Sequence, residues 1–270
     1  MYLAFYNLKE PPFNVTPDPR FLFFTQEHRE AFDSLRYGIE QRKGFITLTG
    51  EVGCGKTTVC RAVLSSLPPP TRTALVLNPS LTESQLLRAI LVDLGLKPRG
   101  RDRLAYIEQL NEFLLACDAR NENVAIVIDE AQDLEAKVME QVRLLSNLET
   151  DQHKLMQLIL IGQPELAKRL RAPEWRQLRQ RIMVHCNLRP LELEDVKQYL
   201  RFRMQVAGGG YPTHFDEGAI RLIQKKSGGI PRVINMIADR ALLAGYVAGT
   251  HTISPQEVKK AVREMESMLH

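Results

Sequence analysis

The sequence has 270 residues, of which 44% are hydrophobic and 25% are charged. This composition is typical of a globular protein with one large domain or two modest ones, and low-complexity segments and internal repeats are absent. The 36 lysines and arginines against 32 aspartates and glutamates give a net charge of +4. An excess this small is compatible with a nucleic acid or an acidic lipid as a partner but argues for neither.

The cysteines and the N-terminus indicate the compartment. No apolar stretch approaches the roughly 18 residues of a membrane span, and residues 1–5 lack the basic region and apolar core of a signal peptide. The cysteines have no C-x-x-C spacing and no paired histidines, so a zinc site is not expected and isolated thiols suit a reducing compartment. They are Cys54, Cys60, Cys117 and Cys186. We therefore expect a cytoplasmic protein.

The first 24 residues are expected to form an extended arm that packs on the core of the next domain. Prolines recur at 11–12 and again at 17 and 19, and proline is incompatible with a helix interior. Phe13, Phe21 and Phe23 are the side chains expected to hold the arm in place.

Residues 25–190 alternate between expected helices and apolar strands. The expected strands are 45–49, 73–77, 124–128 and 156–161, with a last strand beginning near residue 182. The expected helices are 28–41, 56–66, 82–94, 104–117 and 135–148. Near-continuous apolar strands that alternate with helices indicate a parallel sheet with helices on both faces. From residue 191 the pattern contains four helices, 195–206, 216–226, 232–247 and 255–268, and predicts a separate helical domain.

Residues 50–57 read G-x-x-x-x-G-K-T and directly follow the apolar strand 45–49. The pattern predicts a phosphate-binding loop, in which glycines let successive backbone N–H groups curl around a phosphate. Lys56 is expected to reach the β- and γ-phosphates, and the Thr57 hydroxyl to take one Mg²⁺ position. The following helix adds a partial positive charge at its N-terminus. The predicted nucleotide-binding residues are Gly50, Glu51, Val52, Gly53, Cys54, Gly55, Lys56, Thr57, Thr58 and Arg232.

Cys54 lies inside this loop, and two interpretations apply to it. The helix N-terminus could lower the pKa of the thiol and make it oxidisable. We favour the simpler interpretation that a small residue fills a variable position of the motif.

A second motif follows the apolar strand 124–128, where Asp129 and Glu130 come in succession. Both carboxylates are expected at the C-terminal edge of the sheet, where ligands of open α/β sheets bind. Asp129 is expected to hold Mg²⁺, and Glu130 to orient and polarise the attacking water. The alternative is an acidic start of the next helix, stabilised by the helix dipole. The phosphate-loop motif upstream favours the functional interpretation.

Gln163 follows the strand 156–161 and precedes Pro164. Its amide can donate to phosphate and accept from water at the same time, which suits a γ-phosphate sensor. The alternative is a simple turn residue ahead of the proline.

Four arginines are candidates for charge stabilisation in catalysis. Arg176, Arg179 and Arg181 precede a short apolar stretch, and one of them is expected to reach the nucleotide of a neighbouring subunit. Arg181 is preferred because it directly precedes residue 182, whereas a solvated basic face is the alternative. Arg232 stands in the first turn of a helix that begins at Pro231, where an anionic partner offsets its unfavourable position.

Together these motifs resemble those of an AAA+ ATPase: Walker A at 50–57, Walker B at 124–130, sensor 1 at Gln163, an arginine finger and sensor 2 at Arg232. More narrowly, the chain resembles the ExeA/GspA-type ATPases of the general secretion pathway. The resemblance runs from residue 1 to about residue 265. Its matching stretches are 6–13, 16–22, 28–31, 48–53, 129–132, 162–166 and 229–235.

The resemblance implies a P-loop NTPase fold of the α/β class, a three-layer αβα parallel sheet with a C-terminal helical lid. The implied domains are an arm over 1–24, a nucleotide-binding domain over 25–190 and a lid over 191–270. It also implies ATP and Mg²⁺ as cofactors, ATP hydrolysis, and a homo-oligomeric ring or filament with ATP between subunits. Hydrolysis would move the lid through Arg232 and act on the neighbour through Arg181, working on a partner in a secretion or pilus system.

Other interpretations stay open. The same group includes TnsC/TniB-like regulators of transposition, for which double-stranded DNA is the partner. Arg99, Arg101 and Arg103 are the candidate DNA contacts, although we favour a solvated basic turn there. A P-loop GTPase or kinase is disfavoured because no guanine-specificity motif such as N-K-x-D is present. Secretion members continue into a membrane span and a peptidoglycan-binding domain, so we expect either a separate ATPase module or a truncation.

Overall fold

The computed structural model describes residues 2–14, 19–77, 80–150, 154–208 and 214–267. Contacts between Cα atoms group the chain into two compact units. The sheet unit consists of Glu27–Gly50 and Val59–Leu188. The helical unit consists of Met1–Gln26, Glu51–Thr58 and Arg189–His270. The domain boundaries expected after residues 24 and 190 stay predictions.

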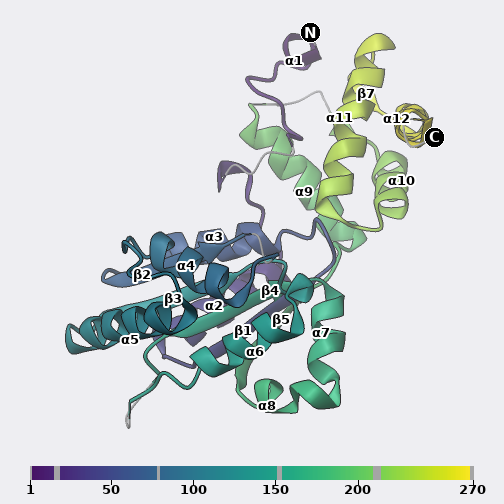
Figure 1. The fold of residues 1–270 in the computed structure, drawn as a ribbon. Coiled ribbons are helices and arrows are strands. Elements are labelled where there is room, and N and C mark those ends of the chain that lie inside the picture. The colour runs from purple at the N-terminus through teal and green to yellow at the C-terminus, as the bar shows by residue number, and fades with distance from the viewer. Residues whose placement is uncertain (1, 15–18, 78–79, 151–153, 209–213, 268–270) are drawn as a thin grey trace. The chain divides into compact units, whose positions relative to one another are not determined.

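The sheet unit contains a five-stranded parallel sheet with the strand order β2-β3-β4-β1-β5. The strands are β1 (Phe45–Gly50), β2 (Thr71–Val76), β3 (Asn123–Ile128), β4 (Gln157–Gly162) and β5 (Ile182–Leu188). Every residue of β1 and β4 is buried, as expected for strands that are covered on both faces. The predicted α/β class with a parallel sheet is therefore confirmed (Figure 1).

Helices cover both faces of this sheet. One face packs against the helices α4 (Glu83–Asp93), α5 (Arg103–Ala119), α6 (Ala136–Leu145), α7 (Pro164–Arg171) and α8 (Arg176–Arg179). Helix α2 (Gln26–Glu40) lies on the other face, because a Cβ on Gly38 would be 2.7 Å from Ile46 Cδ1 and 3.1 Å from Val184 Cγ2. The right-handed crossover from β1 to β2 assigns α3 (Lys56–Ser66) to the same face as α2.

The helical unit contains the four helices expected in the C-terminal region. They are α9 (Leu193–Val206), α10 (Glu217–Ser227), α11 (Pro231–Val247) and α12 (Pro255–Ser267). Two short parallel strands, β6 (His214–Phe215) and β7 (Thr252–Ile253), were not expected from the sequence. Two residues are too few to produce an alternating pattern that distinguishes a strand from a loop.

The arm differs from its expected position. It begins with a short helix α1 (Tyr2–Phe5) and contains a 3-10 turn, η1 (Pro19–Phe21). Its buried side chains lie in the apolar core of the C-terminal helices, not in the core of the sheet unit. Tyr6 is an example, since its hydroxyl donates to the carbonyl of Leu242 at 2.9 Å. The arm covers apolar residues of the C-terminal helices, since α1 contacts α11 and η1 contacts α9.

Candidate nucleotide-binding site

The predicted phosphate loop connects β1 to α3. Gly53 and Gly55 have φ values of 82° and 92°, which residues with a Cβ rarely adopt. Lys56 is 6% exposed, and its ammonium group donates to the Glu51 carbonyl oxygen at 3.0 Å. The lysine therefore folds back over the loop. A loop with left-handed glycines, a helix N-terminus and a buried lysine fits a bound phosphate.

The start of α11 lies directly against this loop. The Arg232 backbone N–H donates to the Gly53 carbonyl oxygen at 3.4 Å. A Cβ added to Gly53 would lie 2.8 Å from Arg232 Cβ and 3.0 Å from Ile230 Cγ2. Only glycine fits at residue 53 without movement of its neighbours. The structure therefore brings Arg232 to the phosphate loop.

The acidic pair stands at the C-terminal end of β3. Asp129 is 4% exposed, its N–H donates to the Val76 carbonyl at 2.9 Å, and its Oδ1 accepts the Glu130 N–H at 2.9 Å. Glu130 has a φ of 51°, in the left-handed region that side chains other than glycine rarely occupy. Such conformations cost about 1 kcal/mol or more and cluster at functional sites. The sharp turn at Glu130 leads into the 3-10 helix η2 (Ala131–Asp133).

Side-chain amides connect the ends of β3 and β4. Gln163 Nε2 donates to Glu130 Oε2 at 3.2 Å, and Gln132 Nε2 donates to the same oxygen at 2.8 Å. Gln132 Oε1 accepts the Gln163 backbone N–H at 3.0 Å. The structure thus brings Glu130 and Gln163 together, and it adds Gln132, whose role is not apparent from the sequence motifs.

The remaining predicted residues divide between the two units. Lys56, Thr57 and Thr58 belong to the helical unit, whereas Asp129 and Glu130 belong to the sheet unit. Their combination in one site is part of the proposal below.

Two of the candidate finger arginines lie near the beginning of β5. Arg181 Nη1 donates to Ser146 Oγ and to Asn147 Oδ1, and Arg179 Nη1 donates to the Arg171 carbonyl at 3.0 Å. The first residue of β5 pairs with the first residue of β1, so Arg181 lies at the amino ends of the strands. The phosphate loop follows the opposite, carboxyl end of β1.

The cysteines near the phosphate loop are neutral thiols. Burial raises the pKa of Cys54, and this effect exceeds the opposite influence of the Lys56 ammonium. Burial, together with the Asp129 carboxylate, raises the pKa of Cys60 to about 12. These directions agree with Cys54 as a small filling residue and disagree with a reactive thiolate.

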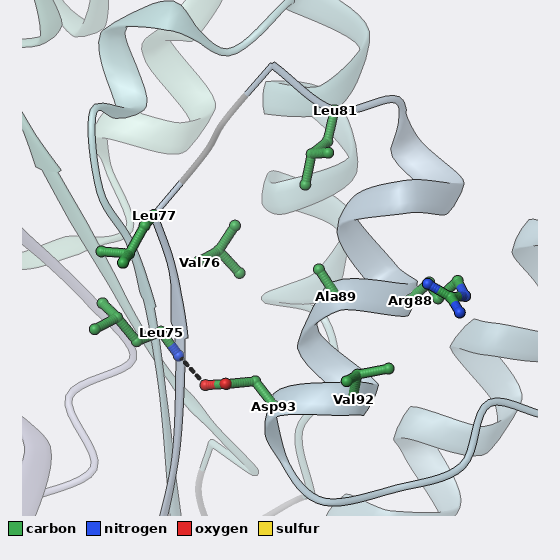
Figure 2. Close-up of a pocket in the computed structure, with 8 residues that line it drawn as sticks. All are labelled: Leu75, Val76, Leu77, Leu81, Arg88, Ala89, Val92 and Asp93. Atoms are coloured by element: carbon green, nitrogen blue, oxygen red, sulfur yellow. Dashed lines mark hydrogen bonds between the residues drawn. The ribbon is translucent and has the colours of Figure 1, made fainter.

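A separate apolar hollow of about 390 Å³ opens between the edge strand β2 and helix α4 (Figure 2). Its lining residues are Leu75, Val76, Leu77, Leu81, Arg88, Ala89, Val92 and Asp93. Asp93 Oδ2 accepts the Leu75 N–H at 2.6 Å, which satisfies an N–H group at the open edge of the sheet. None of the predicted site residues lines this hollow.

Comparison with known proteins finds a matching family model and a similar relative. A family model described as an AAA domain matches residues 39–170. The chain is 46% identical over 271 residues to General secretion pathway protein A of Aeromonas hydrophila, with 99% of this chain covered. Residues 39–170 therefore match the AAA domain family, and the chain as a whole is similar to General secretion pathway protein A. It spans about half the length of that relative, 49%. Among the described residues, no helix combines the length and the apolar character that crossing a membrane requires.

Solved structures show the same fold. The chain matches Drosophila ORC bound to DNA with a TM-score of 0.71 and 18% identity, covering 98% of this chain and 65% of the other. It matches Aeropyrum pernix ORC2, solved in ADPNP-ADP complexes, with a TM-score of 0.69 and 17% identity, covering 95% and 72%. It matches the Thermotoga maritima RuvB branch migration motor with a TM-score of 0.58 and 20% identity, covering 89% and 70%. At these identities the likeness concerns the fold alone.

Proposed function

We propose that this chain binds ATP together with Mg²⁺ and hydrolyses it to ADP and phosphate. The observation that carries the proposal is the phosphate loop, with Gly53 and Gly55 in left-handed conformations and Lys56 buried at the start of α3. These features suit a polyphosphate anion. The fold that the chain shares with ORC2, described with ADPNP and ADP, supports an adenine nucleotide.

Each residue has a defined task in this proposal. Lys56 exchanges the Glu51 carbonyl for phosphate oxygens, and Arg232 contacts the same phosphates from α11. Thr57 and Asp129 would hold Mg²⁺, which would offset the negative charge on the phosphate oxygens. Glu130 accepts a proton from the attacking water. Gln163, next to Glu130, orients that water toward the γ-phosphate.

The test is Glu130→Gln, which keeps the shape of the side chain but cannot accept the proton. We expect the turnover of ATP to fall at least about a hundredfold, while the dissociation constant for ATP changes little. Lys56→Ala is expected to lose ATP binding instead. Glu165→Gln, an exposed glutamate on α7, serves as the matched control with normal turnover. Unchanged turnover in Glu130→Gln contradicts the assignment, and retained affinity in Lys56→Ala contradicts the phosphate-loop site.

We propose a ring or filament of identical cytoplasmic subunits with ATP at each interface, acting on a protein of a secretion or pilus system. The relative named General secretion pathway protein A supports the secretion system.

DNA binding stays a prediction of the sequence. The exposed Arg99 forms an ion pair with Glu112 at 3.4 Å, and Asp102 between the other two arginines caps α5 through the Ala105 N–H. One carboxylate in the loop, Asp102, and one on α5, Glu112, therefore offset part of this positive charge.

A further inference from the structure

Gln132 occupies a central place among the polar groups at the ends of β3 and β4. It is only partly exposed, in the 3-10 helix that directly follows Glu130. Its Nε2 donates to Glu130 Oε2 at 2.8 Å and to Asp133 Oδ2 at 3.0 Å. Its Oε1 accepts the Gln163 backbone N–H at 3.0 Å. Both ends of the side-chain amide therefore have partners.

The arrangement fixes the orientation of this amide. A backbone N–H can only donate, so the Gln163 N–H requires the amide oxygen of Gln132 to face β4. The NH₂ group must then face the two carboxylates. Gly162 leaves the space for this contact, because a Cβ there would lie 2.8 Å from Gln132 Oε1.

The contacts also distinguish the two oxygens of the Glu130 carboxylate. Oε2 accepts from Gln132 and from the Gln163 side chain, at 2.8 Å and 3.2 Å. Within the described part of the chain, both side-chain hydrogen bonds to Glu130 reach Oε2. An oxygen that already accepts two hydrogen bonds is poorly placed to accept a proton. The lone pairs of Oε1 remain available to a water molecule.

We infer that Gln132 is a positioning residue that holds Glu130 Oε2 and thereby selects Oε1 as the proton acceptor. The inference rests on the proposed ATP hydrolysis. In that step the water oxygen bonds to the γ-phosphorus, the bridging oxygen leaves with ADP, and the water proton passes to Oε1. Gln132 also ties the end of β3 to the end of β4, so Glu130 and Gln163 keep a fixed geometry.

Two substitutions distinguish the hydrogen bond that the amide oxygen of Gln132 accepts from the hydrogen bonds that its NH₂ group donates. Gln132→Met keeps the length of the side chain but removes all its hydrogen bonds. Gln132→Glu can still accept the Gln163 N–H but cannot donate to Glu130. Gln256→Met replaces an exposed glutamine on α12 and is the matched control. For each variant we measure the turnover of ATP, the dissociation constant for ATP, and hydrogen exchange of the Gln163 amide in the nucleotide-free protein.

Both Gln132 variants are expected to lose roughly tenfold or more in turnover with ATP affinity within about threefold of the parent. Exchange of the Gln163 amide is expected to speed up in Gln132→Met and to stay slow in Gln132→Glu. Full turnover in Gln132→Glu overturns the inference, as does an equal loss of affinity and turnover in both variants. If Glu130→Gln abolishes turnover while both Gln132 variants keep it, only the inference fails. If Glu130→Gln keeps turnover, the proposed function of Glu130 fails as well.

Discussion

Glu122 forms ion pairs with two arginines and directly precedes β3. Its Oε2 pairs with Arg72 Nε at 2.9 Å and its Oε1 pairs with Arg120 Nε at 2.9 Å. Hydrogen bonds from Arg120 and then from Arg72 lower the pKa of Glu122 from 4.5 to about 2. A carboxyl group with a lowered pKa in the folded state stabilises the protein above its unfolded pKa. That contribution is lost as the pH falls from about 4.5 to about 2.

We therefore expect Glu122→Gln to be less stable than the parent at pH 7 and nearly equal to it near pH 2. Urea unfolding at a series of pH values measures the difference in free energy of unfolding. Glu112→Gln is the control, because Glu112 and its partner Arg99 are both exposed and 3.4 Å apart. A constant difference between Glu122→Gln and the parent from pH 7 to pH 3 would contradict the assignment.

The sequence marks those candidate residues whose chemistry is local. Lys56 and Asp129 stand in fixed motifs directly after expected strands, and their roles in ATP binding stay predictions. Gln132 was not predictable in the same way. Its role depends on the left-handed turn at Glu130 and on a hydrogen bond to residue 163, which lies 31 positions away in the chain.

At the scale of elements, a buried arginine of α9 adds polar contacts to the apolar packing that holds the arm. Arg203 is 7% exposed, and it donates through Nε to the Pro12 carbonyl at 2.5 Å and through Nη2 to the Asn14 carbonyl at 3.0 Å. Its guanidinium group also lies 4.8 Å from the centre of the Phe21 ring. A single side chain thus satisfies two carbonyl groups of the arm, which contains little regular structure of its own.

Arg203→Met is expected to lower the free energy of unfolding by roughly 2–4 kcal/mol, because it leaves these carbonyl groups without their charged donor. Proteolysis in the arm is expected to become faster. Arg201→Met, an exposed position on the same helix, should change the stability by less than about 0.5 kcal/mol. Equal stability and equal arm proteolysis in the two variants would show that Arg203 does not hold the arm.

Elements with strong periodicity were predicted well, and the arm was not placed correctly. Strand β1 is a short run of apolar residues and threonines before a glycine, and α11 begins with a proline, so the sequence marks both. The prolines of the arm indicate that it is irregular but not which surface it covers. That surface depends on contacts such as Arg203 to Pro12, between residues separated by 191 positions.

At the scale of the whole molecule, the position of Arg181 bears on self-assembly. It lies at the amino ends of the strands, whereas the phosphate loop follows the carboxyl end of β1. Six residues of β1 separate the two edges, which corresponds to roughly 20 Å. Any action of Arg181 on ATP therefore requires the nucleotide of another subunit, and its bonds to Ser146 and Asn147 must be exchanged for phosphate oxygens.

Mixing two inactive variants tests this arrangement. Arg181→Ala lacks the arginine but keeps Glu130, and Glu130→Gln lacks the base but keeps Arg181. In an equimolar mixture, an interface is competent when the Arg181→Ala subunit supplies Glu130 and the Glu130→Gln subunit supplies Arg181. Random assembly makes about one interface in four competent, so the mixture should regain roughly a quarter of the parent activity. Arg179→Ala, mixed in the same way, decides between these two candidate arginines. A mixture with no more activity than its separate components excludes action across the interface, because each subunit then fails to supply what its neighbour lacks.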